Sequence, residues 1–465
     1  MRRLAAIAAI AALTALAACA GPRAPPPPAA AVTAPQAWRD AAPGEAAGVD
    51  ARWWAAFADD SLTAVVDRAL SNNTDIAIAA GRVAEARAQF RLAEAQRWPS
   101  FAIAASGGRQ RDVSAFGAPQ AQTAGRAVAQ AAYDTDLFGR LAATSGAARE
   151  ALLATEAARD NVRLAVAASA AGGYITLRGL DARLVVLRET VTAREAALKL
   201  IRRRAEAGYG TQLDLRQAEA DTRATAQQIP VVELAIRRQE GGLSLLLGDN
   251  PRAIARGAAL AALTGPAIPA GVPSALLRRR PDVAQAEHVL AGADRSLDAA
   301  RAAFLPNVQL TASGGYVASN LLSDEIGVFS LGGSVLAPIF DTGRLRAQQD
   351  AAVARRDQAA FAYRKTALNA FREVEDALAA TQRTAEQERE VTAQRMALAE
   401  AYRLAESRYR AGYSPYLDQL EAQRGLLAAE LLLVQVRADR LNAAVSLYQA
   451  LGGGWSAATP DRPPR

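Results

Sequence analysis

The side chains that most often carry catalysis or bind metals are almost absent from this chain of 465 residues. It contains one histidine, His288, and one cysteine, Cys19. A His/Cys-rich zinc site needs several such ligands, and a catalytic triad needs a nucleophile together with a histidine base. His288 alone cannot supply either set, and its place in a helical segment after Pro281 favours a surface or packing role. The sequence therefore predicts no catalytic residue, no metal site, no bound cofactor and no enzymatic activity.

The single cysteine lies where a lipid anchor would be attached. Residues 1–3 carry positive charge, and residues 4–16 are apolar but too few to span a bilayer. The Leu-Ala-Ala-Cys sequence that ends at Cys19 resembles the lipobox of bacterial lipoproteins. Cleavage would remove residues 1–18 as a signal peptide and leave Cys19 to carry a covalent lipid, including palmitate. An ordinary secretory signal is the alternative. Ala20 after the cysteine, by resemblance to lipoprotein sorting rules, favours the outer membrane.

The composition indicates long helices rather than a nucleic-acid-binding surface. Hydrophobic residues make up 51% of the chain and aromatic residues only 5%, with alanine and arginine supplying much of the rest. The net charge is +7, but arginines alternate with acidic residues along helical faces, and no dense basic block is present. After Cys19 no run of about 18 apolar residues occurs. If the mature chain crosses a bilayer, it is therefore expected to do so as a β-barrel.

The chain contains an internal duplication. Residues 75–108 align without a gap on residues 282–315, an offset of 207 (282 − 75), and both segments end in Ala-Ser-Gly-Gly. Further along, the Ala-Gly-Tyr sequence at 207–209 recurs at 411–413, and the Leu-Gly sequence at 247–248 recurs at 451–452, an offset of 204 (411 − 207). A shared order over the whole length predicts two structurally equivalent halves.

Each half is predicted to read helix, strand, strand, long helix, helix. The first repeat, 62–248, is predicted to contain helices 62–97, 142–207 and 211–247 and strands 100–111 and 123–136. The second repeat, 276–451, is predicted to contain helices 282–304, 344–411 and 415–450 and strands 307–317 and 326–338. At ~1.5 Å per residue, each long helix would be a rod of about 100 Å. Gly208 and Gly412 are placed to end these rods, Thr211 to cap the next helix, and Ser414 and Pro415 to occupy the N-cap and first helical position.

The strand pairs alternate between polar and apolar side chains. One face of the strand beginning at residue 307 carries Asn307, Gln309, Thr311 and Ser313, and the other carries Val308, Leu310, Ala312, Gly314 and Tyr316. Such alternation over about ten residues suits a transmembrane barrel, although the edge of a soluble sandwich would show it too. Four strands cannot close a barrel, so several protomers would share one. A dimer would provide eight strands and a trimer twelve, and the residues favour more than two protomers without fixing three.

Several motifs in a fixed order resemble one known family. They are Leu-Ala-Ala-Cys at 16–19, Trp53-Trp54 with Phe57 and Asp59, Ala69-Leu70 with Asn73 and Asp75, Leu-Arg-Arg-Arg-Pro-Asp-Val at 277–283, Phe-Leu-Pro at 304–306, Tyr-Arg-Ala-Gly at 409–412, and Leu-Gly-Gly-Gly-Trp at 451–455. The chain resembles the TolC-like outer-membrane factor family, in its lipoprotein branch of OprM/NodT type. The resemblance covers nearly the whole mature chain.

The resemblance implies the exit duct of a multidrug efflux system. It implies a mainly α-helical homotrimer whose twelve strands form one outer-membrane β-barrel that continues into a long periplasmic α-barrel. An equatorial domain would draw on residues 38–61, 249–275 and 452–465, and residues 19–37 would be a Pro-rich tether. The implied partners are outer-membrane lipid, a periplasmic adaptor (membrane fusion) protein and an inner-membrane pump of the resistance-nodulation-division (RND) class. The duct would be passive.

Two sites follow as hypotheses. The helix ends at the predicted periplasmic tips would dock the adaptor, and they comprise Gly208, Tyr209, Gly210, Thr211, Gly412, Tyr413, Ser414 and Pro415. The alternative is that these residues only form the turns between helices. By resemblance, the periplasmic gate matches Tyr409, Leu417, Glu421 and Arg424. Glu421 and Arg424 are three residues apart on a helix, close enough to interact with each other or across protomers, and an exposed helix pair of little consequence is the alternative. Glu421 replaces an aspartate usual in the lipoprotein branch.

Two other classes of protein compete with this interpretation. A periplasmic adaptor lipoprotein would also carry a long helical hairpin, but it would need lipoyl-like β-modules around a single hairpin, which the duplication disfavours. A soluble coiled-coil scaffold would lack the alternating strands. Neither the exported substrates nor the cognate adaptor and pump can be inferred from the residues.

Overall fold

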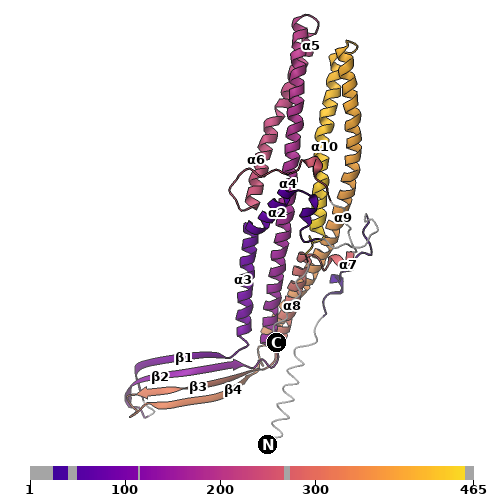
Figure 1. Ribbon diagram of the computed structural model, residues 1–465. Coiled ribbons are helices and arrows are strands. Elements are labelled where there is room, and N and C mark those ends of the chain that lie inside the picture. Colours follow the sequence, from indigo (N-terminus) through magenta and orange to yellow (C-terminus); the bar gives the residue numbers. More distant parts are fainter. Residues whose placement is uncertain (1–24, 40–49, 114–115, 266–272, 456–465) are drawn as a thin grey trace. The chain divides into compact units, whose positions relative to one another are not determined.

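The computed structural model describes residues 25–39, 50–113, 116–265 and 273–455 (Figure 1). The predicted signal peptide 1–18, the predicted lipidation site Cys19 and the C-terminal residues 456–465 lie outside the described residues. The chain forms two compact units. The first comprises Met1–Ala31, Gly81–Glu156 and Gln285–Lys365, and the second comprises Val32–Ala80, Ala157–Ala284 and Thr366–Arg465. Each unit therefore takes segments from both halves of the duplicated sequence.

The order of the main elements is the same in the two halves. The first half contains α2 (Asp60–Asn72), α3 (Thr74–Ala95), β1 (Ser100–Val113), β2 (Pro119–Asp134), α4 (Arg140–Glu206), α5 (Gln212–Ala226) and α6 (Gln228–Leu246). The second contains α8 (Pro281–Ala302), β3 (Asn307–Ser319), β4 (Ile326–Leu336), α9 (Thr342–Arg410) and α10 (Tyr416–Ala450). Short helices lie between or before them: η1 (Pro28–Ala30), η2 (Trp53–Phe57), η3 (Leu260–Ala262) and α7 (Pro273–Leu276).

The single helix expected over residues 62–97 is instead two helices, α2 and α3, separated by Asn73. The backbone of Asn73 is extended, with φ −63° and ψ 132°. Its side-chain Oδ1 accepts hydrogen bonds from the backbone N–H groups of Asp75 (2.9 Å) and Ile76 (3.2 Å). The short amide side chain thus satisfies the first donors of α3, which makes a new helix start at this position favourable. Asn73 Nδ2 also donates to the carbonyl oxygen of Leu246, 3.0 Å away.

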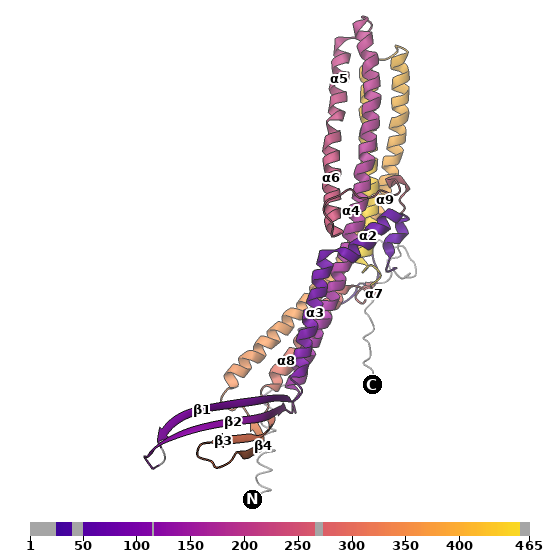
Figure 2. The ribbon, with the colours of Figure 1, turned by 60° about the vertical axis from the view of Figure 1, so that its left-hand side comes forward.

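The helix expected over 211–247 is also divided, into α5 and α6 with Gln227 between them. Pro230 lies in the first turn of α6, the part of a helix that tolerates proline because its N–H groups have no partner within the helix. In the second half the equivalent position is Val434 (230 + 204), and α10 runs without a break through it. The proline therefore accounts for the division into two helices in the first half, where the second half has one. Figure 2 shows α5 and α6 following one another alongside α4.

The four strands form one antiparallel sheet in the order β1-β2-β3-β4. Paired residues share a face, and the register places Phe101, Ala131, Ala312 and Leu331 in one row across the sheet. The opposite face carries polar side chains, and the hydroxyl oxygens of Ser313 and Ser330 are 2.9 Å apart. Phe101 and Leu331 are 80% and 81% exposed. The apolar face is therefore uncovered in the protomer, and β1 and β4 each have a free edge.

A buried cluster organises the second unit around η2 and α2. Trp53 stacks on Tyr448 with ring centroids 5.1 Å apart, and Phe57 and Leu62 are fully buried beside them. The Asp59 carboxylate accepts hydrogen bonds from the backbone N–H groups of Leu62 (2.9 Å) and Ala258 (2.8 Å). This aspartate joins the start of α2 to the segment after α6. Within the part of the chain that the structure describes, no helix combines the length and the apolar character needed to cross a membrane.

Gly315 is the glycine of the sheet that a side chain would disturb most clearly. A Cβ atom at this position would overlap the carbonyl oxygen of Ala127 and lie 2.8 Å from Cα of Val128. We expect Gly315→Ala to lower the free energy of unfolding by about 1–3 kcal/mol, because the paired backbone must shift. Gly108 is the equivalent residue of the first half, and its Cβ would meet nothing within 4 Å, so Gly108→Ala is the control. Thermal unfolding of both variants in detergent measures the difference, and equal melting temperatures would contradict it.

Candidate functional site

The ends of the two longest helices have the same backbone geometry. Gly208 and Gly412 adopt left-handed conformations, with φ +75° and +79°. The N–H of Tyr209 donates to the Arg204 carbonyl oxygen at 2.8 Å, and the N–H of Tyr413 donates to the Arg408 carbonyl oxygen at 2.9 Å. Together with the bond from each glycine N–H to the carbonyl three residues earlier, this is a Schellman motif. Both turns therefore present a tyrosine, and Tyr209 and Tyr413 are 87% and 80% exposed.

The helices that follow these turns begin differently. Thr211 Oγ1 accepts the N–H of Asp214 at 3.0 Å, and Gly210 lies beside it in the turn. In the second half the expected assignment is wrong by one residue: Pro415, with extended ψ of 159°, is the N-cap, and Tyr416 is the first residue of α10. Ser414 lies one position further out. Its hydroxyl is buried and has no hydrogen-bond partner among the described residues.

A small apolar cluster joins the two hairpins just behind these turns. Its buried members come from α4, α5 and α10: Ile201, Leu215, Ala218, Tyr416 and Leu420. The ring of Tyr409 packs against this cluster, 5.5 Å from the ring of Tyr416, and the guanidinium of Arg204 lies 5.3 Å above the Tyr409 ring. Burial, with the negative charge of Asp221 as the next cause, raises the pKa of Tyr416 to about 12. The phenol therefore stays neutral, which suits an apolar contact.

A buried aspartate beside this cluster binds two arginines. Asp221 on α5 accepts a hydrogen bond from Arg424 Nη2 at 2.6 Å and from Arg424 Nε at 3.0 and 3.1 Å. Arg194 Nη1 on α4 lies 3.5 Å from the Asp221 carboxylate and donates to the Asp221 carbonyl oxygen at 2.8 Å. The hydrogen bond to Asp221 raises the pKa of Arg424, whereas burial lowers the pKa of Arg194. Asp221 thus ties α4 and α10 to α5.

The structure brings together only part of the predicted gate. Tyr409 packs beside the apolar cluster and Arg424 binds Asp221, whereas Leu417 is 45% exposed and Glu421 is exposed. The sequence pattern does not predict a role for Asp221 or Arg194. Asp221 and Arg424 are 203 residues apart, and the duplication gives no signal for them, because the position equivalent to Asp221 in the second half is Gly425 (221 + 204).

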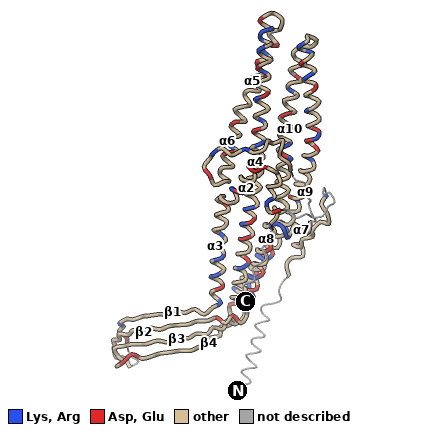
Figure 3. Tube along the Cα trace, in the orientation of Figure 1, with Lys and Arg blue, Asp and Glu red and all other residues tan. Residues whose placement is uncertain are grey.

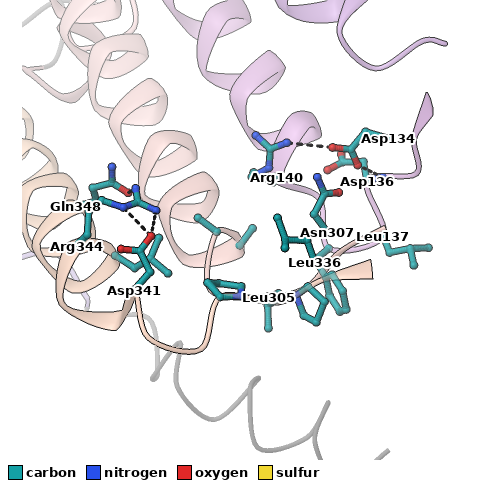
Figure 4. Close-up of a pocket in the computed structure, with 16 residues that line it drawn as sticks. Asp134, Asp136, Leu137, Arg140, Leu305, Asn307, Leu336, Asp341, Arg344 and Gln348 are labelled. Carbon is teal, nitrogen blue, oxygen red and sulfur yellow. Dashed lines mark hydrogen bonds and ion pairs between the residues drawn. The ribbon is translucent and has the colours of Figure 1, made fainter. Parts of the chain in front are cut away.

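Three carboxylates in the first unit, those of Asp134, Asp136 and Glu150, make structural contacts. In the cavity shown in Figure 4, Asp134 binds Arg140 Nη2 at 3.1 Å, and Asp136 accepts the N–H groups of Leu141 (2.8 Å) and Ala142 (2.7 Å) at the start of α4. His288 Nδ1 lies 2.8 Å from Glu150 Oε2. Within the described residues, no group of three or more His, Cys, Asp or Glu side chains could hold a metal ion. These contacts support helix starts rather than ligand binding.

Comparison with known proteins identifies the class. The outer membrane efflux protein family matches residues 65–249 and 272–453, which cover both halves. The solvent efflux pump outer membrane protein SrpC of Pseudomonas putida is 37% identical over 411 residues, which cover 86% of this chain and 87% of SrpC. The outer membrane protein OprJ of Pseudomonas aeruginosa is 36% identical and covers 89% of each chain. The open state of the Neisseria gonorrhoeae MtrE outer membrane channel is similar in structure, with a TM-score of 0.84, 29% identity, and 93% and 98% of the two chains covered.

These matches place the protein among efflux channels. The chain belongs to the outer membrane efflux protein family. The predicted TolC-like fold, the outer-membrane location and the role as an efflux channel rather than an enzyme are therefore confirmed. The comparisons give no support to the adaptor alternative.

Asp221 is the residue that holds α4, α5 and α10 together behind the turns, through its contacts with Arg194 and Arg424. Asp221→Asn would leave the buried Arg194 without a carboxylate, and we expect the free energy of unfolding to fall by on the order of 3 kcal/mol. Glu219 on the same helix binds the exposed Arg202 and Arg216, so Glu219→Gln should change the stability much less. Thermal unfolding and the rate of tryptic cleavage near residues 208–211 and 412–415 measure the effect. Similar values for the two variants would show that Asp221 has no special role.

Proposed function

We propose that the protein is the exit duct of a tripartite efflux pump of the RND class and passively conducts drugs or other small organic molecules out of the cell. Family membership supports this proposal, and so does the similarity to SrpC, a solvent efflux pump outer membrane protein. The observation that carries it is the uncovered apolar face of the β1–β4 sheet, with Phe101, Ile103, Phe329 and Leu331 each at least 80% exposed. A sheet of this kind suits contact with lipid.

The free edges of the sheet support a homotrimer. Backbone groups on an open strand edge have no partner in lipid, so β1 of one copy would pair with β4 of the next. Three copies of a four-stranded sheet would give twelve strands, enough to surround a pore, whereas eight would leave an interior filled by side chains. The strands contain 11 to 16 residues, and about 9–11 tilted residues cross a bilayer.

The remaining parts of the chain have roles consistent with this assembly. Lipid attached to Cys19 would anchor the N-terminus in the outer membrane, with residues 19–37 as the tether. Residues 38–61, 249–275 and 452–465 would form the equatorial domain, and the buried cluster around Trp53 and Asp59 supports their association with the helices. The exposed tyrosine turns at the ends of α4 and α9 would dock a periplasmic adaptor protein, which in turn contacts the inner-membrane pump.

The contact of Asp221 with Arg194 and Arg424 would keep the periplasmic mouth closed. In a trimer each protomer would contribute the same two hairpins, so the exposed Leu417 and Glu421 of α10 would form rings at the mouth. Opening would move the hairpins of each protomer apart, which requires the bidentate bond from Arg424 to Asp221 to break. Because Arg424 is itself 54% exposed, water can replace that bond, and opening would remain reversible.

Conductance across planar lipid bilayers tests both the channel and its gate. The wild-type protein should give small, stable channels, and Arg424→Ala, Glu421→Ala and Asp221→Ala should raise the conductance several-fold, because each removes a charge that holds or lines the mouth. Arg216→Ala removes an exposed charge on α5 that pairs with Glu219 and is the control. Unchanged conductance in all three variants would place the gate elsewhere. Absence of wild-type channels would contradict the proposed function itself.

Substitution of the exposed tyrosines tests the docking turns. The double variant Tyr209→Glu and Tyr413→Glu should abolish resistance in cells that depend on this channel, because charge at the turns would prevent an apolar contact with the adaptor. Trimers should persist, since both side chains point away from the buried cluster behind them. Tyr209→Phe with Tyr413→Phe keeps the rings and should retain resistance. Minimum inhibitory concentrations and native gels provide the measurements, and full resistance in the glutamate variant would refute adaptor docking at these turns.

A further inference from the structure

The apolar face of the sheet carries two arginines at one end. Arg109 and Arg111 follow Phe101 and Ile103 at even spacing along β1, so all four side chains lie on the same face. The register pairs Arg109 with Thr123 and Arg111 with Ala121 of β2. Both arginines are exposed. Figure 3 shows that the middle of the strands is almost free of charge and that charged residues gather toward the loop ends.

These two arginines are the only charged residues on that face within β1 to β4. The acidic residues of the strands, Asp112 and Asp134, pair with Gln120 and Gln309 and lie on the polar face. On the apolar face the neighbours of the arginines are uncharged and mostly small: Gly107, Val113, Pro119, Ala121, Thr123 and Gly125. The positive charge is therefore unmatched within the sheet, and the space beside it is open to a bulky ligand.

The distance of the two arginines from Phe101 along β1 is comparable to the height of the apolar band of an outer-membrane barrel. Eight residues separate Phe101 from Arg109, which is ~27 Å along an extended strand at ~3.4 Å per residue. A strand tilt of about 40° reduces this to roughly 20 Å, and the apolar band of an outer-membrane barrel is about 25 Å tall. Arg109 would therefore lie close to the outer edge of the hydrocarbon layer, and Arg111 would lie about 5 Å further out. The long side chains can reach the headgroups from there.

We propose that Arg109 and Arg111 bind the phosphate groups of an anionic, phosphorylated glycolipid of the lipid A type in the outer leaflet. This inference rests on the proposed barrel. A guanidinium binds phosphate through two parallel hydrogen bonds, and two arginines on one strand about 7 Å apart can share a doubly phosphorylated headgroup. The apolar rows of the same face would contact the acyl chains of that lipid. The site would hold the barrel at a fixed depth and surround it with tightly associated lipid.

Native mass spectrometry of the full-length trimer with added lipid tests the site. Bisphosphorylated lipid A should stay bound to the wild-type protein, and Arg109→Gln with Arg111→Gln should weaken binding at least ten-fold. Monophosphorylated lipid A should bind the wild-type protein less tightly. Arg126→Gln removes the arginine on the opposite face of the same sheet and should leave binding unchanged. Arg109→Lys with Arg111→Lys keeps the charges but loses the paired hydrogen bonds, so it should bind more tightly than the glutamine variant and less tightly than the wild type.

Three results would overturn the proposal. Binding that does not depend on the lipid phosphates, or that falls equally in the Arg126→Gln variant, would show a nonspecific contact with lipid. The third result concerns Asp324 and Glu325, which precede β4 and would approach β1 of the next copy. Suppose that the Asp324→Asn, Glu325→Gln variant and the Arg109→Gln, Arg111→Gln variant both dissociate trimers. The arginines would then bind acidic residues of a neighbouring protomer and not lipid. Conductance of the wild-type protein is measured separately, so failure of the lipid site is distinguished from failure of the proposed channel.

Discussion

The pairing of backbone groups at the edges of the β1–β4 sheet is the constraint on which the assembly depends. A four-stranded sheet with one uncovered apolar face is satisfied neither in water, where the face is exposed, nor alone in lipid, where the edges are unpaired. Association of several copies within a bilayer would remove both problems, because the edges would pair with one another and lipid would cover the apolar face. The long helices that lead to and from the strands then acquire the same symmetry, so that each side chain at a helix end is repeated around one axis. Oligomer formation and channel formation are in this sense a single event.

Duplication explains why one protomer can supply two equivalent strand pairs and two equivalent helical hairpins. The two Schellman turns at Gly208 and Gly412 have nearly identical φ angles, although they are separated by 204 residues (412 − 208). The halves differ where a single residue changes the backbone. Pro230 lies in the first turn of a new helix, α6, in the first half, whereas α10 continues through Val434. Asp221 likewise has a glycine, Gly425, as its counterpart, so only the first hairpin provides the carboxylate that both arginines bind.

In the proposed gate, the asymmetric placement of that carboxylate would suit a mouth that opens and closes. Arg194 is buried and contacts both the backbone and the side chain of Asp221, so it would stay with the first hairpin during any movement. Arg424 is half-exposed and belongs to the second hairpin. The Asp221 carboxylate is therefore shielded from water on the Arg194 side, whereas water can reach the contact on the Arg424 side. An entirely buried pair would be too costly to separate, and an entirely exposed pair would contribute too little to hold the helices together.

The sequence by itself determined the features that depend on near neighbours. Period-two alternation predicts the two faces of the strands, and the repeated motifs predict two equivalent halves. The Gly-Tyr sequences predict the turns after α4 and α9. The break between α2 and α3 also has a local cause, because the Asn73 amide caps α3. The sequence does not reveal this break, because the residues on both sides of Asn73 follow the periodicity of a helix. Only the tertiary structure decided that Arg424 binds Asp221 rather than Glu421. Partners 203 residues apart are chosen by the packing of α4, α5 and α10 around one apolar cluster, and no spacing along the chain encodes that packing.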